Sequence, residues 1–179
     1  MRLFIGIFLP EEIKNYLYEL ENKLKKLLHG KINWIAKKNI HFTLKFIGDI
    51  NETKLNGIKE KLNKIKFDSF EVELDKIGVF PDENNPRIIW AGLNPKEKLI
   101  ELQKKVDSEL LDLFSKDQDF KVHITLGRIK LIKNKEEFKT NMKIEIERKK
   151  FEINEFCLVK SKLSKDGPKY EILERFNPK

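Results

Sequence analysis

The sequence has very little cysteine and no long hydrophobic run. Cys157 is the only cysteine in 179 residues, which excludes an intramolecular disulfide framework and a cysteine-rich zinc site. No apolar stretch approaches the roughly 20 residues of a membrane-spanning helix. The opening "MRLFIGIFLPEEI" places acidic residues where a signal peptide would have its cleavage site. We therefore expect a cytoplasmic protein in a reducing compartment, with no membrane contact.

Arginine and histidine are also scarce, although the chain is basic. It has 5 Arg, 32 Lys and 3 His, and its net charge is +8. Such a surface attracts polyanions, above all nucleic acid. The lysines are spread along the chain, however, and Lys- and Glu-rich surfaces are also a habit of composition in some organisms. Charge alone leaves both interpretations open.

The order of predicted elements indicates an α+β protein whose chain, residues 1–179, forms one domain. Apolar, β-prone runs predict strands, and apolar residues at helical spacing predict helices. Asn94 is expected to cap the third helix, with Pro95 at its first position. The expected strands cover 2–9, 40–48, 70–80, 87–93, 121–129, 150–163 and 169–176, with a short apolar segment at 32–35; the expected helices begin near residues 10, 52, 95 and 135.

The two halves of the chain repeat the same order. "FLPEEI…HFTL" and "LNPKEKL…HITL" each read as strand, helix started by proline, and strand containing His-x-Thr-Leu. Pro10 precedes His41 by 31 residues, and Pro95 precedes His123 by 28. This pattern indicates an ancient duplication. We expect two pseudosymmetric lobes, each a mainly antiparallel sheet with helices packed on the outside, and an active-site cleft between them.

The repeated phrase places one imidazole and one hydroxyl side by side in each half. Residues i and i+2 of a strand point to the same face, so His41 lies beside Thr43, and His123 beside Thr125. Arg128 would point away in an unbroken strand, but a bulge at Gly127 would return it to the cleft. Two histidines suit a reaction that removes one proton and donates another. Hydroxyls and an arginine suit a phosphoryl group.

The phrases "IHFTLKFIG" and "VHITLGRIK" closely resemble the paired His-x-Thr-x motifs of the two-histidine (2H) phosphoesterases. The nearest branch is the RNA 2′,3′-cyclic phosphodiesterases, historically called 2′-5′ RNA ligases. The resemblance implies metal-independent hydrolysis of RNA 2′,3′-cyclic phosphate ends to 2′-phosphomonoesters, with no cofactor. It makes His41 the proton donor and His123 the proton acceptor, with Thr43, Thr125 and Arg128 binding the phosphate. The implied partner is such an RNA end, tRNA fragments included, and we expect a monomer.

Other residues and other functions offer alternatives to this prediction. His29 has no Thr partner and is expected to be a solvated residue at a helix end. Trp34 and Trp90 are expected in the core, whereas base stacking by these or by other aromatics is the minority interpretation; the other candidates are Phe4, Phe8 and Tyr170. A metal-dependent phosphatase would need carboxylates beside the histidines, and neither phrase has one before Asp49. RNA ligation through a 2′-5′ bond, and RNA binding without catalysis, stay open.

Overall fold

The protein is described by a computed structural model covering residues 1–165 and 167–179; Asp166, in the expected turn before the last strand, lies outside the described residues. The α+β prediction is confirmed. The elements in order are β1 (Arg2–Phe8), α1 (Glu11–Leu27), β2 (Gly30–Trp34), the 3₁₀ turn η1 (Lys37–Asn39), β3 (His41–Asp49), the 3₁₀ turn η2 (Glu52–Lys54), α2 (Leu55–Leu62), β4 (Phe70–Phe80), β5 (Ile88–Asn94), α3 (Glu97–Glu109), β6 (Ile124–Ile132), α4 (Lys135–Asn141), β7 (Lys150–Ile153), β8 (Phe156–Lys162) and β9 (Lys169–Phe176).

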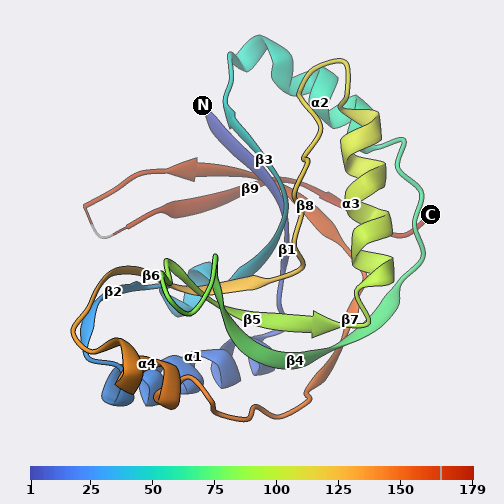
Figure 1. Cartoon of the computed structure of the whole chain (residues 1–179). Coiled ribbons are helices and arrows are strands. Elements are labelled where there is room, and N and C mark those ends of the chain that lie inside the picture. Colours follow the sequence, from blue (N-terminus) through green and yellow to red (C-terminus); the bar gives the residue numbers. More distant parts are fainter. Residues whose placement is uncertain (166) are drawn as a thin grey trace.

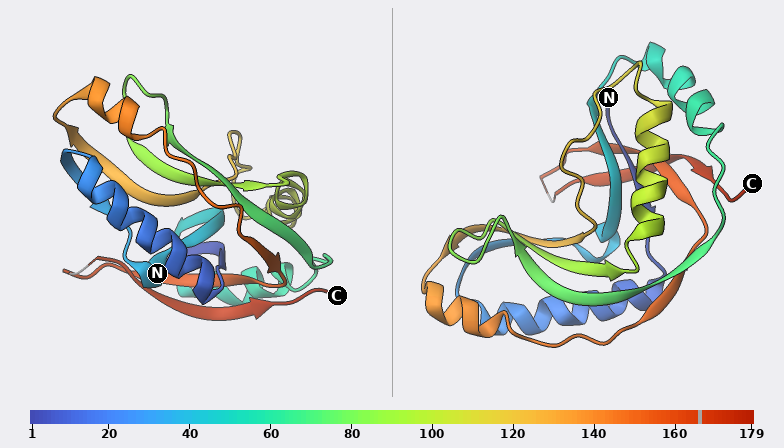
Figure 2. Two further views of the ribbon diagram at one scale, coloured as in Figure 1. Left: turned by 90° about the horizontal axis from the view of Figure 1, so that it is seen from below. Right: turned by 45° about the vertical axis from the view of Figure 1, so that its right-hand side comes forward.

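The strands form one curled antiparallel sheet, not two. Its nine strands follow the order β7-β4-β5-β6-β3-β1-β8-β9, and β2 pairs with β6 off this path. The two halves join where β3 pairs with β6 at Phe42 and Ile124. The prediction of a separate sheet in each lobe is therefore corrected. The physical reason is that this pairing connects strands that would otherwise leave backbone groups unpaired at the junction. Figures 1 and 2 show the curl.

Helices cover the face of the sheet opposite the repeated histidines. Helix α1 follows Pro10, carries Glu11 and Glu12 in its first turn and buries Ile13 and Leu17, as the helical spacing predicted. Helix α3 packs on β3, and α1 lies beside α4 below β4 and β5 (Figure 1). The main apolar core lies between these helices and the sheet. Among the described helices, none has the length and apolar character needed to span a membrane.

Two predicted boundaries were wrong. Asn94 does not cap a helix: it is the last residue of β5, and α3 begins at Glu97. Its pairing with Glu73 in the sheet holds it in extended backbone. The expected strand 150–163 is divided at Asn154 and Glu155. Its first part, β7, pairs with β4, and its second part, β8, pairs with β1 and β9. One apolar stretch thus supplies the strand at one end of the sheet and the second strand from the other end, which local periodicity does not reveal.

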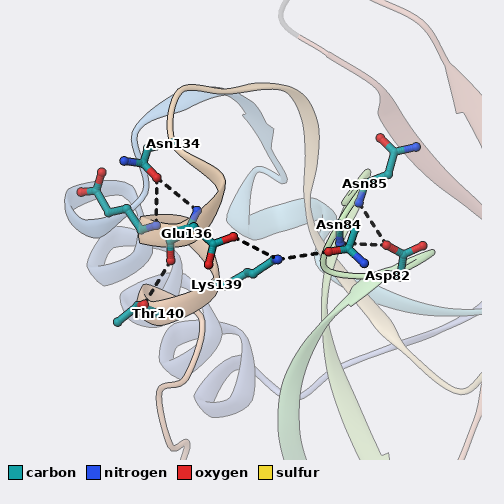
Figure 3. A network of polar contacts seen from close by, with 8 residues as sticks. Asp82, Asn84, Asn85, Asn134, Glu136, Lys139 and Thr140 are labelled. Carbon is teal, nitrogen blue, oxygen red and sulfur yellow. Dashed lines mark hydrogen bonds and ion pairs between the residues drawn. The ribbon is translucent and has the colours of Figure 1, made fainter.

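The loop between β4 and β5 is held in place by α4 (Figure 3). Lys139 Nζ donates to Asn84 Oδ1 at 3.0 Å and to Glu136 Oε1 at 3.2 Å. Within the loop, Asp82 Oδ1 accepts the backbone N–H groups of Asn84 and Asn85 at 2.8 and 3.0 Å, a turn that aspartate favours. These contacts therefore fix the conformation of the loop that begins directly after Phe80.

Candidate active site

The two motif histidines make equivalent hydrogen bonds to the backbone. His41 is the first residue of β3, and its Nδ1 lies 2.6 Å from the carbonyl oxygen of Asn39. His123 directly precedes β6, which begins one residue later, and its Nδ1 lies 2.8 Å from the carbonyl oxygen of Lys121. A carbonyl only accepts, so each Nδ1 carries a proton. Both Nε2 atoms are therefore left to exchange protons.

Each motif carries a bulge immediately after its threonine. The register of β3 against β1 skips Leu44, and that of β6 against β5 skips Leu126. The bulge expected at Gly127 is thus present one residue earlier, and the first motif has its counterpart. A bulged residue reverses the alternation of side chains. Consequently the fifth residue after each histidine, Phe46 or Arg128, returns to the face of the histidine and is exposed.

The structure brings the predicted phosphate-binding residues toward the histidines. Thr43 Oγ1 lies 3.0 Å from His41 Nε2, and the hydroxyl donates this hydrogen bond while the imidazole is neutral. Thr125 is half-buried and pairs with Trp90 of β5. Beyond the larger effect of burial, the charge of Arg128 acts on the pKa of both His41 and His123. Arg128 therefore lies within electrostatic reach of both imidazoles.

Burial lowers the pKa of both histidines. It disfavours the charged imidazolium of His41, and the nearby positive charge of Arg128 acts in the same direction, while the hydrogen bond to Asn39 opposes them. For His123, burial again has the largest effect, the hydrogen bond to the Lys121 carbonyl opposes it, and the charges of Arg128 and Lys121 add to it. Both groups therefore titrate below the ordinary histidine value near 6.5.

Aromatic rings border each histidine. The His41 ring lies 4.8 Å from Phe4 and 5.2 Å from Tyr170, centroid to centroid. The edge of His123 meets Phe80 at 5.1 Å, and Phe80 stacks on Trp90 at 5.0 Å. These apolar contacts cause much of the burial that lowers the two pKa values.

Both tryptophans were expected in the core. Trp34 packs against the main core, but Trp90 does not belong to it. Trp90 sits on the face of the sheet that carries Thr125, its cross-strand partner. Gly78 makes room for it, since a Cβ there would stand 2.2 Å from the indole. Among the described side chains, the buried Nε1 of Trp90 has no hydrogen-bond partner. Phe80 thus lies between His123 and Trp90. The sequence analysis did not identify Phe80 as a neighbour of the site.

A pocket of about 280 Å³ opens between the two motifs. Thr43 of the first motif and His123 of the second both line it, together with apolar and polar side chains from β3 and from the segment before β6. Phe46, which is 66% exposed, forms part of its wall. A substrate in this pocket would touch both halves of the chain.

The third histidine, His29, belongs to neither motif. His29 is exposed, as expected, and its Nδ1 lies 3.0 Å from Glu137 Oε1.

The hairpin between β8 and β9 contacts the residue that supports His41, because Asn39 Nδ2 donates to the carbonyl oxygen of Pro168 at 2.8 Å. Among the described residues, no three His, Cys, Asp or Glu side chains gather in a way that could hold a metal ion.

Comparison with known proteins identifies the family. The family described as "LigT like Phosphoesterase" matches residues 7–90 and 93–170, one range in each half of the chain. The chain belongs to the LigT-like phosphoesterases. The predicted membership of the two-histidine phosphoesterases is therefore confirmed.

Relatives of this LigT-like chain extend over almost its whole length. An RNA 2′,3′-cyclic phosphodiesterase of Methanocaldococcus jannaschii is 35% identical over 98% of this chain and 100% of its own. A protein of the same name from Archaeoglobus fulgidus is 32% identical over 98% and 99%.

Solved structures share the LigT-like fold. A Thermus thermophilus protein has a TM-score of 0.84 at 28% identity, covering 99% of this chain and 97% of its own. Escherichia coli LigT in complex with 3′-AMP has a TM-score of 0.75 at 24% identity, with coverage of 99% and 97%. The second likeness supports the curled antiparallel fold alone.

Proposed function

We propose that this chain is an RNA 2′,3′-cyclic phosphodiesterase that leaves a 2′-phosphomonoester. The observation that carries the proposal is the matched pair of histidines, each with Nδ1 bound to the carbonyl oxygen two residues earlier, which leaves Nε2 as the nitrogen that can transfer a proton. The relatives named RNA 2′,3′-cyclic phosphodiesterase support the choice of substrate. RNA carrying a 2′,3′-cyclic phosphate end, tRNA fragments included, is the proposed partner.

In the proposed reaction His123 is the general base and His41 the general acid. Neutral His123 accepts a proton on Nε2 from a water molecule, and the water oxygen forms a bond to phosphorus. The bond from phosphorus to the ribose 3′ oxygen breaks, and His41 donates its Nε2 proton to that oxygen. The two motifs support their imidazoles alike, so the geometry does not distinguish the acid from the base. The order of acid and base is therefore taken from the family resemblance.

Thr43, Thr125 and Arg128 are proposed to bind the phosphoryl oxygens. Hydroxyl donors and a guanidinium stabilise the charge that develops on those oxygens in the transition state. The bulge at Leu126 supports this role for Arg128, because it turns Arg128 toward the face that carries both histidines. His41 must exchange its contact with Thr43 for one with the leaving oxygen, so Thr43 is well placed to hold the imidazole until substrate binds.

We also propose that residues 1–179 form a single domain of two pseudosymmetric lobes. Phe42 and Ile124, paired between β3 and β6, occupy the same position in the two motifs. The family match also falls into two ranges, 7–90 and 93–170, with one motif in each. A monomeric state and a cytoplasmic location stay predictions from the sequence.

The deciding experiment incubates the purified chain in excess EDTA with an RNA that ends in a 2′,3′-cyclic phosphate. His41→Ala and His123→Ala run alongside, and His29→Ala is the matched control because His29 is exposed and remote from the motifs. We expect conversion to the 2′-phosphate by the wild type and His29→Ala, and a loss of about 10²–10⁴-fold in the other two.

Failure of the folded wild type to convert this RNA would overturn the proposal, and dependence on added metal would overturn its mechanism. A 3′-phosphate product would contradict the assigned leaving oxygen. Adding an RNA with a free 5′ hydroxyl tests the reverse reaction, ligation through a 2′-5′ bond. RNA binding that persists without any turnover would favour the non-catalytic binding module.

A further inference from the structure

A buried lysine lies directly behind the first motif. Lys45 is 2% exposed, although lysine is almost never fully buried unless it is paired. The bulge at Leu44 turns it away from Thr43, toward α3. Its Nζ donates at 2.5 Å to Asp107 Oδ1, at 2.9 Å to the carbonyl oxygen of Ser115 and at 3.3 Å to Asp117 Oδ1. All three ammonium protons therefore have acceptors.

Lys45 and its partners connect three parts of the chain: β3, α3 and the segment after α3. Asp107 lies on α3, and its second oxygen accepts Gln103 Nε2 at 2.8 Å and the backbone N–H of Asp117 at 3.1 Å. Ser115 and Asp117 lie beyond the end of α3. The network thus fixes both the side chain and the backbone of Asp117 against β3 and α3.

The fixed segment continues into the second motif. Residues 115–123, all of them described, form neither helix nor strand, so their position depends on contacts of this kind. The carbonyl oxygen of Lys121 holds Nδ1 of His123 at 2.8 Å. Asp117 and Lys121 also line the pocket that Thr43 and His123 share. Only three residues separate the tether at Asp117 from Lys121, whose carbonyl oxygen supports His123.

We propose that Lys45 is a positioning residue for His123: through Asp107, Ser115 and Asp117 it fixes the segment that orients the second imidazole and forms one wall of the pocket. A buried ion pair is a poor means of stabilising a fold, because an apolar side chain of similar volume often stabilises as well. A fully paired ammonium does, however, fix directions that apolar packing leaves free. The inference rests on the proposed function only for its kinetic readout.

The test uses two variants. Lys45→Met replaces the ammonium with an apolar side chain of similar length. Asp117→Asn weakens only the outer partner, whose side chain is 36% exposed, so it carries little risk to folding. We expect kcat/KM to fall about 10- to 100-fold in Lys45→Met, since small displacements of a reacting group cost that much, and less in Asp117→Asn. Asp112→Asn, which removes the nearby exposed pair with Lys61, is the control and leaves kcat/KM unchanged.

A second readout does not require activity. NMR titration of the histidines in the wild type and both variants reports whether the imidazole keeps its Lys121 contact. Burial lowers the pKa of His123 and the Lys121 hydrogen bond raises it. Both depend on the position of this segment, so loosening it shifts the titration of His123 and leaves that of His41 in place. Unchanged titration and unchanged kcat/KM in folded Lys45→Met would overturn the proposal. If Lys45→Met does not fold, Asp117→Asn decides by the same two measurements. An inactive wild type would instead contradict the proposed function, and the titration would still stand.

Discussion

Phe42 of β3 pairs with Ile124 of β6, and the two residues follow the two motif histidines at the same position. Both are fully buried. Because neighbours along a strand point to opposite faces, burying this pair turns His41 and Thr43 outward on one side of the junction, and Thr125 on the other. The junction of the two half-sheets therefore places the two motifs at one site. This relationship, rather than either motif alone, makes a two-histidine reaction possible.

The pH dependence of kcat/KM is expected to be bell-shaped with its maximum below about pH 6.5. Catalysis needs His123 neutral and His41 protonated, and the maximum lies midway between the two pKa values. Burial holds both pKa values below that of free histidine. The profile of kcat should lie at higher pH, since bound phosphate favours imidazolium. Initial rates from pH 4.5 to 9 test this; a plateau that continues to high pH would contradict the acid role of His41.

Replacement of Arg128 by glutamine should move that profile toward higher pH. After burial, the charge of Arg128 is one of the causes that lower the pKa of both histidines, so removing it raises both values. The loss of a charge-assisted contact to phosphate should also reduce kcat/KM about 10- to 100-fold. Lys130 is an exposed lysine of the same strand, so Lys130→Gln is the control for net charge. An unshifted profile in Arg128→Gln would place this side chain away from the cleft.

Thr43→Val should lower kcat/KM by about 10- to 100-fold while leaving the fold intact. Valine has nearly the same shape, but it removes the hydroxyl that lies 3.0 Å from His41 Nε2 and is proposed to bind phosphate. Thr43→Ser keeps the hydroxyl and should retain most activity. Steady-state kinetics of both variants, with exposed Thr53→Val for comparison, checks this. Equal losses in the serine and valine variants would show that shape, not the hydroxyl, matters.

Glu21 should make the chain less stable as pH rises. Its carboxylate is buried on α1, and neither oxygen has a hydrogen-bond partner among the described residues. Burial raises its pKa to about 8, although Lys25 Nζ, 4.0 Å from Oε2, acts in the opposite direction. The folded state therefore keeps this proton above the unfolded pKa near 4.5, and the cost of ionisation grows up to about pH 8. Glu21→Leu should gain roughly 2–4 kcal/mol at pH 8.5 relative to the wild type, and much less at pH 4.5. Urea unfolding at the two pH values measures the difference; an equal gain at both would contradict a titrating Glu21.

Local sequence patterns predicted the main elements and placed each motif histidine beside its threonine, whereas Arg128 was named mainly through the family resemblance. Helical spacing in 10–29 predicted α1, and the period of two placed each histidine beside its threonine. Patterns failed where the decisive partner lay far along the chain. The extended backbone of Asn94 depends on Glu73, and the division of 150–163 depends on two different strands, β4 and β1. Capping and alternation describe neighbours in sequence, so they carry no record of such pairings.

The sequence by itself determined that two equivalent strands would each present an imidazole and a hydroxyl on one face, since alternation follows from strand geometry alone. It also determined the family, through the paired motifs. Only the tertiary structure decided that one sheet joins both halves, that bulges at Leu44 and Leu126 return Phe46 and Arg128 to the face of the histidines, and that Phe80 meets His123. It alone placed Lys45 between Asp107 and Asp117. Each of these depends on register or on burial against a distant element, and both are set by packing of the whole chain rather than by any local preference.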